Sequence, residues 1–110
     1  MTNQEMNDFI YDEIVVDCYD DWEVASAWNT VLSEELIFPF QAKAPIKQRG
    51  KAATLEQVEV VEFSDFGGSK AYVGVDWKGV IVKVDLLDLE DVEADEETLK
   101  YIAAWKFWNK

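Results

Sequence analysis

The chain has 110 residues, 49% of them hydrophobic and 14% aromatic, and its net charge is −13 at neutral pH. This length suits one domain spanning residues 1–110, and the apolar fraction is sufficient for a packed core. The charge excludes nucleic acid and anionic membranes as favourable partners, and no apolar run reaches the ~20 residues of a membrane span. The N-terminal sequence MTNQEMNDF lacks the basic and apolar regions of a signal peptide, so a cytoplasmic location is expected.

The residue types that are missing limit the possible chemistry. The chain has no His and a single Cys, Cys18, which excludes His-dependent triads, imidazole metal sites and multi-cysteine metal sites. Any bound metal therefore has oxygen ligands, which favours Ca²⁺ or Mg²⁺. Nearby acids are expected to raise the pKa of the Cys18 thiol. Most of the acidic residues are expected to be exposed and the sequence indicates no substrate cleft, so the chain is not expected to be an enzyme.

The acidic residues are unevenly distributed along the chain. Residues 1–42 contain ten acidic and no basic residues, whereas residues 43–84 contain seven basic and five acidic residues. Cations and basic proteins are the partners that such a surface favours. The alternative is that the charge only keeps the protein in solution, although −13 exceeds the magnitude of ~2–8 that small domains need for this.

The N-terminal half is expected to form an arm, a strand and a helix. Residues 1–9 are interpreted as a flexible arm, and residues 11–16 are rich in β-branched side chains and are predicted as a short strand. A helix is predicted from Asp20 or Asp21, with Asp20 as its N-cap, and it ends before Phe38 because Pro39 disfavours helical angles in its predecessor. Its apolar face contains Ala25, Trp28, Val31, Leu32 and Leu36.

The C-terminal half is expected to form strands and a final helix. Strands are predicted at residues 38–46, 57–63, 71–77 and 80–84, with turns at residues 65–68 and at Lys78-Gly79. Asp95 is the predicted N-cap of a helix that runs to about Trp108, with one face made by Leu99, Ile102, Ala103, Lys106 and Phe107. Most of the five Trp residues are expected in the core. The predicted fold is α+β, a small SH3-like antiparallel β-barrel decorated by an N-terminal-half helix and a C-terminal helix.

Two groups of acids flank the first predicted helix. Asp17, Asp20 and Asp21 precede or begin it; Asp20 and Asp21 suit the positive end of the helix dipole and need no ion to explain them. Glu34 and Glu35 lie at the negative end, where carboxylates are unfavourable by ~0.3–1 kcal/mol each. The helix is long enough to keep any ions at its two ends apart.

The far end of this helix is expected to receive two further acids. If the strand at 11–16 packs antiparallel to the helix, Asp12 and Glu13 lie near Glu34 and Glu35. Four converging carboxylates require a positive partner, which is either a calcium ion or a salt bridge from a residue such as Lys43.

A third acidic segment follows the last strand. Asp85, Asp88 and Asp91 recur every three residues, which fits one face of a short helical turn or an ordinary solvated face. Neither Asp17 nor Asp85 begins an EF-hand loop, because the required ligands at the third position and glycine at the sixth are absent.

Several segments together resemble the cyanobacterial calcium-binding protein family typified by CcbP, which is associated with heterocysts. They are EIVVDCY, the FPF that follows the first helix, DWKGVIVKVDLLDLEDVEADEET and the closing W-x2-W, in this order. The resemblance implies a helix-decorated barrel-like fold without EF-hands, calcium binding by surface carboxylates, and a role in calcium buffering or signalling during heterocyst differentiation.

The sequence therefore predicts a non-enzymatic protein that buffers or senses cytosolic Ca²⁺. The candidate metal ligands are Asp12, Glu13, Asp17, Asp20, Asp21, Glu34 and Glu35. The alternative is an acidic interaction module that docks on a basic protein partner.

Overall fold

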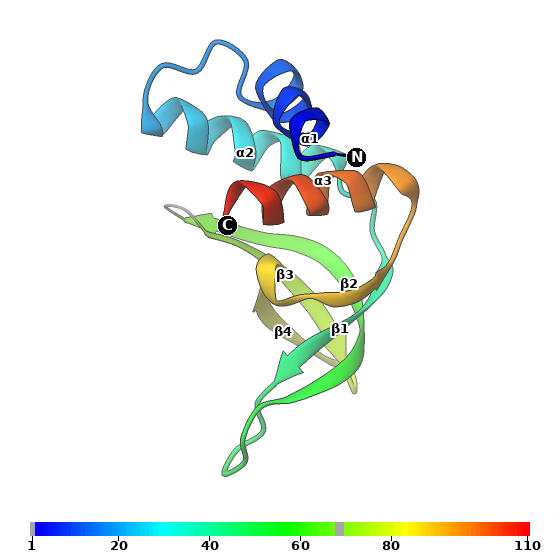
Figure 1. Cartoon of the computed structure of the whole chain (residues 1–110). Helices are drawn as coiled ribbons and strands as arrows, with labels where there is room; N and C mark the ends of the chain where they lie inside the picture. Colours follow the sequence, from blue (N-terminus) through cyan, green and yellow to red (C-terminus); the bar gives the residue numbers. More distant parts are fainter. Residues whose placement is uncertain (1, 68–69) are drawn as a thin grey trace.

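The computed structural model describes residues 2–67 and 70–110 and shows an α+β fold elongated to 45 × 27 × 23 Å. The helices gather at one end of a five-stranded antiparallel sheet, and the β1–β2 connection points away from them (Figure 1). In chain order the elements are α1 (Asn3–Phe9), the π-helix η1 (Ile10–Ile14), α2 (Asp21–Glu35), β1 (Phe40–Ile46), β2 (Thr54–Gly67), β3 (Lys70–Trp77), β4 (Val80–Asp85), the 3-10 helix η2 (Leu86–Asp88), β5 (Glu90–Glu93) and α3 (Glu96–Trp108).

The N-terminal segment differs from the prediction. Residues 3–9 are helical where a flexible arm was expected, and the strand predicted at 11–16 is wrong because the chain continues as η1. Thr2 and Glu5 form a reciprocal capping box, with Thr2 Oγ1 accepting from Glu5 N–H at 3.1 Å. Met6, Ile10 and Ile14 are buried at four-residue spacing, so burial of one helical face outweighs the β-propensity of the following residues.

The sheet has the strand order β4-β3-β2-β1-β5. In β1 every second residue is buried, from Phe40 to Ile46, which gives the period of two expected for a strand with one face on the core. The β2–β3 register shifts twice, between Val60 and Glu62 and between Phe63 and Asp65, and such bulges bend a strand. Among the described residues no pairing joins β4 to β5, so the sheet is not closed and the SH3-like barrel is not confirmed.

The strand predictions were correct in position, but their ends differ: β1 begins at Phe40, two residues after the predicted start, and other strands are longer than predicted. β2 begins at Thr54 and continues to Gly67, through most of the turn predicted at 65–68; residue 68 lies outside the described residues. β5 was not predicted as a strand, and it pairs with β1. The Lys78-Gly79 turn between β3 and β4 is confirmed, with positive φ angles of 53° and 83° at these two residues.

Helices α2 and α3 pack against each other through a Trp-rich core. Trp28 of α2 and Trp105 of α3 are buried and meet edge-on, with ring centroids 5.0 Å apart. The predicted core face of α2 is confirmed by the burial of Trp28 and Leu32. The predicted face of α3 is confirmed at Ile102, which is buried, but it is wrong at Leu99, which is 39% exposed. Thr98 and Trp105, which the prediction left out, are buried instead. No helix among the described residues is long and apolar enough to cross a bilayer.

Candidate metal centre

The seven predicted ligands are all exposed, and five of them lie at the ends of α2 or in the connection that precedes it. Asp12 and Glu13 belong to η1, and Glu34 and Glu35 end α2. The remaining three are Asp17 and Asp20, in the connection that precedes α2, and Asp21, the first residue of α2. We call these three the N-terminal acidic patch, and the other four the C-terminal acidic patch.

In the N-terminal acidic patch, Asp20 has the structural role that the sequence predicts. It is the N-cap of α2, and its Oδ1 accepts the Glu23 N–H at 2.8 Å. Asp17 has no such role and adopts a positive φ of 54°, which short polar side chains tolerate better than most. The patch therefore combines one acid fixed by a backbone hydrogen bond with two whose side chains make none among the described residues.

The Cys18 thiol reports the electrostatics of this patch. Partial burial raises the pKa of Cys18 above its ordinary value, and the negative charges of Glu23, Asp17 and Asp20 raise the pKa further. The predicted direction is thus confirmed, with burial as the larger cause. Because the thiol stays protonated, Cys18 is a poor metal ligand, and oxygen atoms are the donors that remain.

Glu34 and Glu35 of the C-terminal acidic patch lie where α2 meets the start of α3. The last turn of α2 contains no basic residue, and Leu36 leaves the helix in an extended conformation. The Ile37 N–H then donates to Oγ1 of the fully buried Thr98, at 3.0 Å. This bond fixes the end of α2 against the first turn of α3, which adds further acids to the region.

Tyr101 of α3 shows which carboxylates converge at this junction. Burial is the main reason that the pKa of Tyr101 is raised, and the negative charges of Glu35, Glu97 and Glu13 raise it further. These acids come from α2, α3 and η1, so three elements bring negative charge to one phenol. Glu97 was not among the predicted ligands, because a residue following the Asp95 N-cap already had an explanation in the helix dipole.

The salt-bridge alternative can be compared with the ion pairs of the structure. The described residues contain three pairs: Lys43–Asp91 at 3.2 Å, Lys83–Asp65 at 3.1 Å and Lys100–Glu97 at 3.5 Å. None includes a residue of either acidic patch, and Lys43, the predicted neutralising partner, is bound to Asp91 instead. Lys100 is the cation at the Tyr101 junction, where its Nζ also lies 4.7 Å from the centroid of the Phe9 ring.

The third acidic segment has structural partners. Asp85 caps η2 by accepting the Leu87 N–H at 2.9 Å, and Asp91 forms the ion pair with Lys43. Asp88 ends η2, whereas Asp91 lies in β5 with a positive φ of 46°. The three therefore do not form one helical face, and the structure favours the ordinary structural interpretation for this segment.

The acidic patches fit a hard cation in chemistry but are not assembled into a cage. Within residues 2–67 and 70–110, no three His, Cys, Asp or Glu side chains are grouped closely enough to hold a metal. Ca²⁺ takes six to eight oxygen ligands in flexible geometry, so carboxylate rotation, water and backbone carbonyls would have to complete a site. The last carbonyls of α2 have no partner within the helix and are available oxygens at the C-terminal acidic patch.

The chain matches a protein family described as calcium binding, the CcbP family, over residues 8–109. It is similar to the crystal structure of Anabaena CcbP, with a TM-score of 0.85 and 29% identity, over 99% of this chain and 92% of that chain. It is also similar to a structure described as a calcium-binding protein in the calcium-binding form, with a TM-score of 0.74 and 30% identity, over 96% and 90% of the two chains. A comparison with curated proteins gives no match.

Proposed function

Because the chain belongs to the calcium-binding CcbP family, we propose that it binds Ca²⁺ through the two acidic patches at the ends of α2. The N-terminal site consists of Asp17, Asp20 and Asp21. The C-terminal site consists of Asp12, Glu13, Glu34 and Glu35. The observation that carries this proposal is that all seven carboxylates are exposed and that none forms an ion pair within the described residues.

The two sites take separate ions. Helix α2 has 15 residues and so spans about 22 Å at 1.5 Å per residue, which is too far for one ion to reach both ends. At the C-terminal site the cation also removes an unfavourable interaction of Glu34 and Glu35 with the helix dipole, ~0.3–1 kcal/mol for each. At the N-terminal site it must overcome the same dipole, and we therefore assign the tighter binding to the C-terminal site.

In the cell, the proposed role is to buffer or sense cytosolic calcium. The surface carboxylates give reversible binding with little reorganisation of the core, because none of the seven is buried. The similarity to Anabaena CcbP supports a cyanobacterial setting, and we propose a cytoplasmic role during heterocyst differentiation on that basis.

Calorimetric titration with Ca²⁺ in ~150 mM salt tests the proposal. Saturable binding that persists in excess Mg²⁺ supports dedicated sites, whereas heat that disappears with added salt indicates only screening. The double variant E34Q/E35Q should weaken the tighter phase, because it removes two carboxylates of the C-terminal site.

The matched control is E90Q/E93Q, which makes the same charge change at two exposed residues of β5. It should change calcium affinity only by the general loss of negative charge. Equal losses in both double variants would show that the location of the acids does not matter, and would contradict the C-terminal site.

A further inference from the structure

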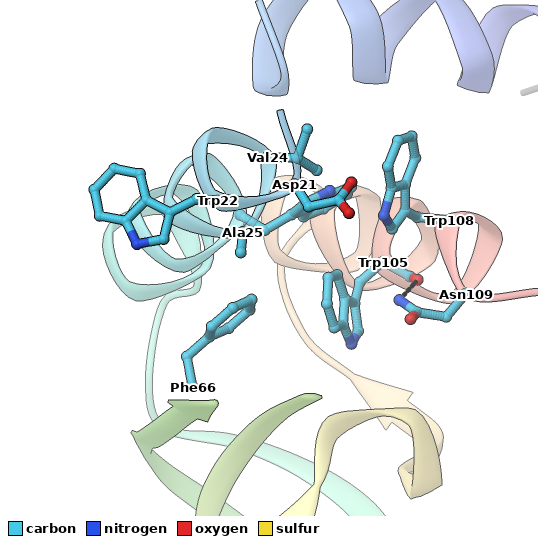
Figure 2. A pocket seen from close by; sticks show the side chains of 9 residues that line it. Asp21, Trp22, Val24, Ala25, Phe66, Trp105, Trp108 and Asn109 are labelled. Carbon is cyan, nitrogen blue, oxygen red and sulfur yellow. Dashed lines mark hydrogen bonds between the residues drawn. The ribbon is translucent and has the colours of Figure 1, made fainter. Parts of the chain in front are cut away.

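A hollow lined by aromatic side chains lies beside the N-terminal half of α2. Its volume is about 540 Å³, and its walls include Trp22, Trp28, Phe66, Trp105 and Trp108, with Asp21 as the acid. Figure 2 shows Trp22 and Phe66 on one side and Trp105, Trp108 and Asn109 on the other, with Asp21 between them. We call this the aromatic hollow, and its volume lies within the range of ~300–1,000 Å³ typical of binding pockets.

The aromatic hollow continues into two neighbouring depressions. One, of about 320 Å³, shares Trp22, Ala25 and Phe66 with it. The other, of about 480 Å³, shares Asp21, Val24 and Trp108 with it and is lined by Asp17 and Asp20 as well. The three depressions are adjacent, and we treat them together as one groove beside the N-terminal half of α2, apolar in the middle and acidic at one end. None of the described residues that line it is Lys or Arg.

Two of the aromatic side chains that line this groove are mostly exposed to solvent. Trp22 is 78% exposed and Tyr19, which lines the acidic end, is 85% exposed. The other four Trp residues are buried or half-buried. Trp, Tyr and Arg are the residues most often found at the energetic centre of protein interfaces, so an exposed Trp beside an apolar hollow suits a contact that forms only with a partner.

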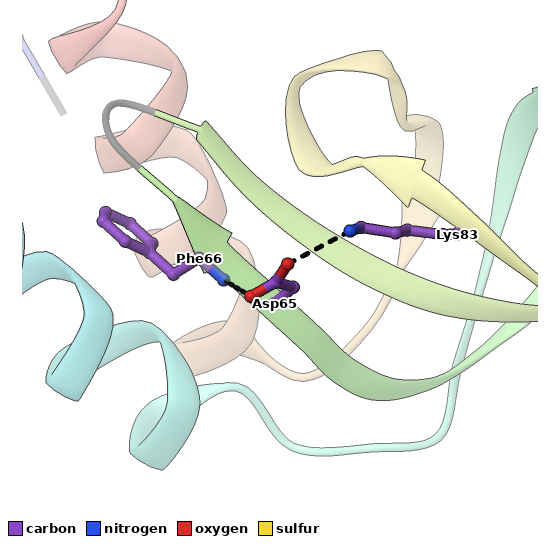
Figure 3. A network of polar contacts seen from close by, with 3 residues as sticks. All are labelled: Asp65, Phe66 and Lys83. Atoms are coloured by element: carbon purple, nitrogen blue, oxygen red, sulfur yellow. Dashed lines mark hydrogen bonds and ion pairs between the residues drawn. The ribbon is translucent and has the colours of Figure 1, made fainter.

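Phe66 is held at the edge of the groove by a polar anchor. Asp65 accepts the Phe66 N–H at 2.8 Å and pairs with Lys83 of β4 at 3.1 Å, while the Phe66 ring points toward the helices (Figure 3). The Lys83 side chain lowers the pKa of Asp65, with the Phe66 N–H as the next cause, so the anchor stays charged at neutral pH. The Phe66 ring also meets Trp105 of α3, with ring centroids 5.8 Å apart, so it closes one side of the groove against the helices.

We infer that this groove docks a basic amphipathic segment of a protein partner, with apolar side chains in the aromatic hollow and Lys or Arg against Asp17, Asp20 and Asp21. Charge complementarity selects this occupant, because residues 1–42 contain no basic side chain. A second copy of the chain would bring a further charge of −13 to the same place. The inference goes beyond calcium binding. It uses the carboxylates of the proposed N-terminal calcium site, so the docking test is made without calcium.

A synthetic amphipathic peptide of Leu and Lys tests the groove in calcium-free buffer with chelator. Fluorescence titration should show binding that weakens with salt, and a scrambled peptide of the same composition should bind much more weakly. Trp22→Ala should reduce the affinity about tenfold or more, as expected for a central aromatic residue. Ile81→Ala, a matched change at a 53% exposed residue of β4, should leave it within about twofold.

Trp22→Ala is expected to remain folded, because the side chain it removes is mostly solvated, and a thermal melt verifies this. It should also keep the calcium affinity of the unmodified protein, so failure of the docking proposal and failure of the calcium proposal give different results. Equal binding of the scrambled peptide, or equal affinities of the Trp22→Ala and unmodified proteins, would overturn the inference. Self-association of the protein through this groove in the absence of peptide would also overturn it. The same holds if a small apolar dye binds in a manner that depends on Trp22 while the peptide does not bind.

Discussion

Replacement of Thr98 by Val is expected to weaken the junction between α2 and α3 without changing its packing. Thr98 is fully buried, and its hydroxyl accepts the Ile37 N–H at 3.0 Å and donates to the Asp95 carboxylate. Valine has the same shape, so the change removes the polar contacts without leaving a cavity. Loss of the Ile37 bond alone should cost about 1–2 kcal/mol, or roughly 4–8 °C in Tm for a domain of this size.

The same variant has a pH signature. Because the Thr98 side chain is the main cause of the lowered pKa of Asp95, the contact stabilises the folded protein above the pKa that Asp95 has in the unfolded chain. This contribution is lost as the pH falls through the lower, folded-state pKa. The unmodified protein should therefore be more stable than the variant by the largest amount at neutral pH. This difference in unfolding free energy should become smaller as the pH falls into the acidic range.

Urea unfolding at neutral and acidic pH measures this difference, and calcium titration of the folded variant shows whether the junction also positions Glu35. The control is Thr54→Val at an exposed position of β2, which should change stability by no more than a few tenths of a kcal/mol. Equal stabilities of the Thr98→Val and unmodified proteins would refute the role assigned to the buried hydroxyl. If the difference in unfolding free energy between the two proteins does not change with pH, the hydroxyl of Thr98 does not stabilise the charged form of Asp95.

Three further predictions concern single residues. Asp20→Ser should keep the N-cap of α2 and weaken calcium binding, whereas Asp20→Ala should also cost ~1 kcal/mol of stability. Urea unfolding measures the stability and calorimetry measures the calcium binding. Equal stability of the two variants would contradict the role of Asp20 as the N-cap. Saturating Ca²⁺ should lower the raised pKa of Tyr101, because the ion offsets the charge of nearby Glu35; ultraviolet titration against Tyr101→Phe measures the shift, and its absence would place the ion elsewhere. Lys83→Ala should raise the pKa of Asp65 toward its ordinary value, as followed by NMR, and an unchanged value would mean that the ion pair does not form in solution.

The helices α2 and α3 were predictable because their start signals are local. Asp20 and Asp95 each accept a backbone N–H three residues ahead, and this depends only on neighbouring residues in the chain. Which side of α3 is buried in the core could not be predicted from local signals of this kind. Thr98 counts as polar in a hydrophobicity pattern, yet it is fully buried because Ile37, 61 residues earlier in the chain, supplies its hydrogen-bond donor.

The N-terminal helix was missed although its signals are present. Thr2 and Glu5 have the spacing of a capping box, and Met6, Ile10 and Ile14 have the spacing of a helical face. The β-branched residues at 14–16 outweighed these signals in the prediction. Only the packing of the buried face against the rest of the protein decides between the two, because β-propensity is weak and depends on context.

The sequence by itself determined the chemistry available to this protein. It contains no His, one Cys and an N-terminal region without basic residues, so only oxygen donors and unneutralised charge remain for binding. The tertiary structure alone decided which charges meet. Lys43 forms an ion pair with Asp91 on the neighbouring strand. Glu97, Glu13 and Glu35 all lie near Tyr101. Trp22 is exposed to solvent beside the aromatic hollow. The reason is that charge and hydrophobicity are properties of residues, whereas proximity is set by the packing of elements that are distant in the chain.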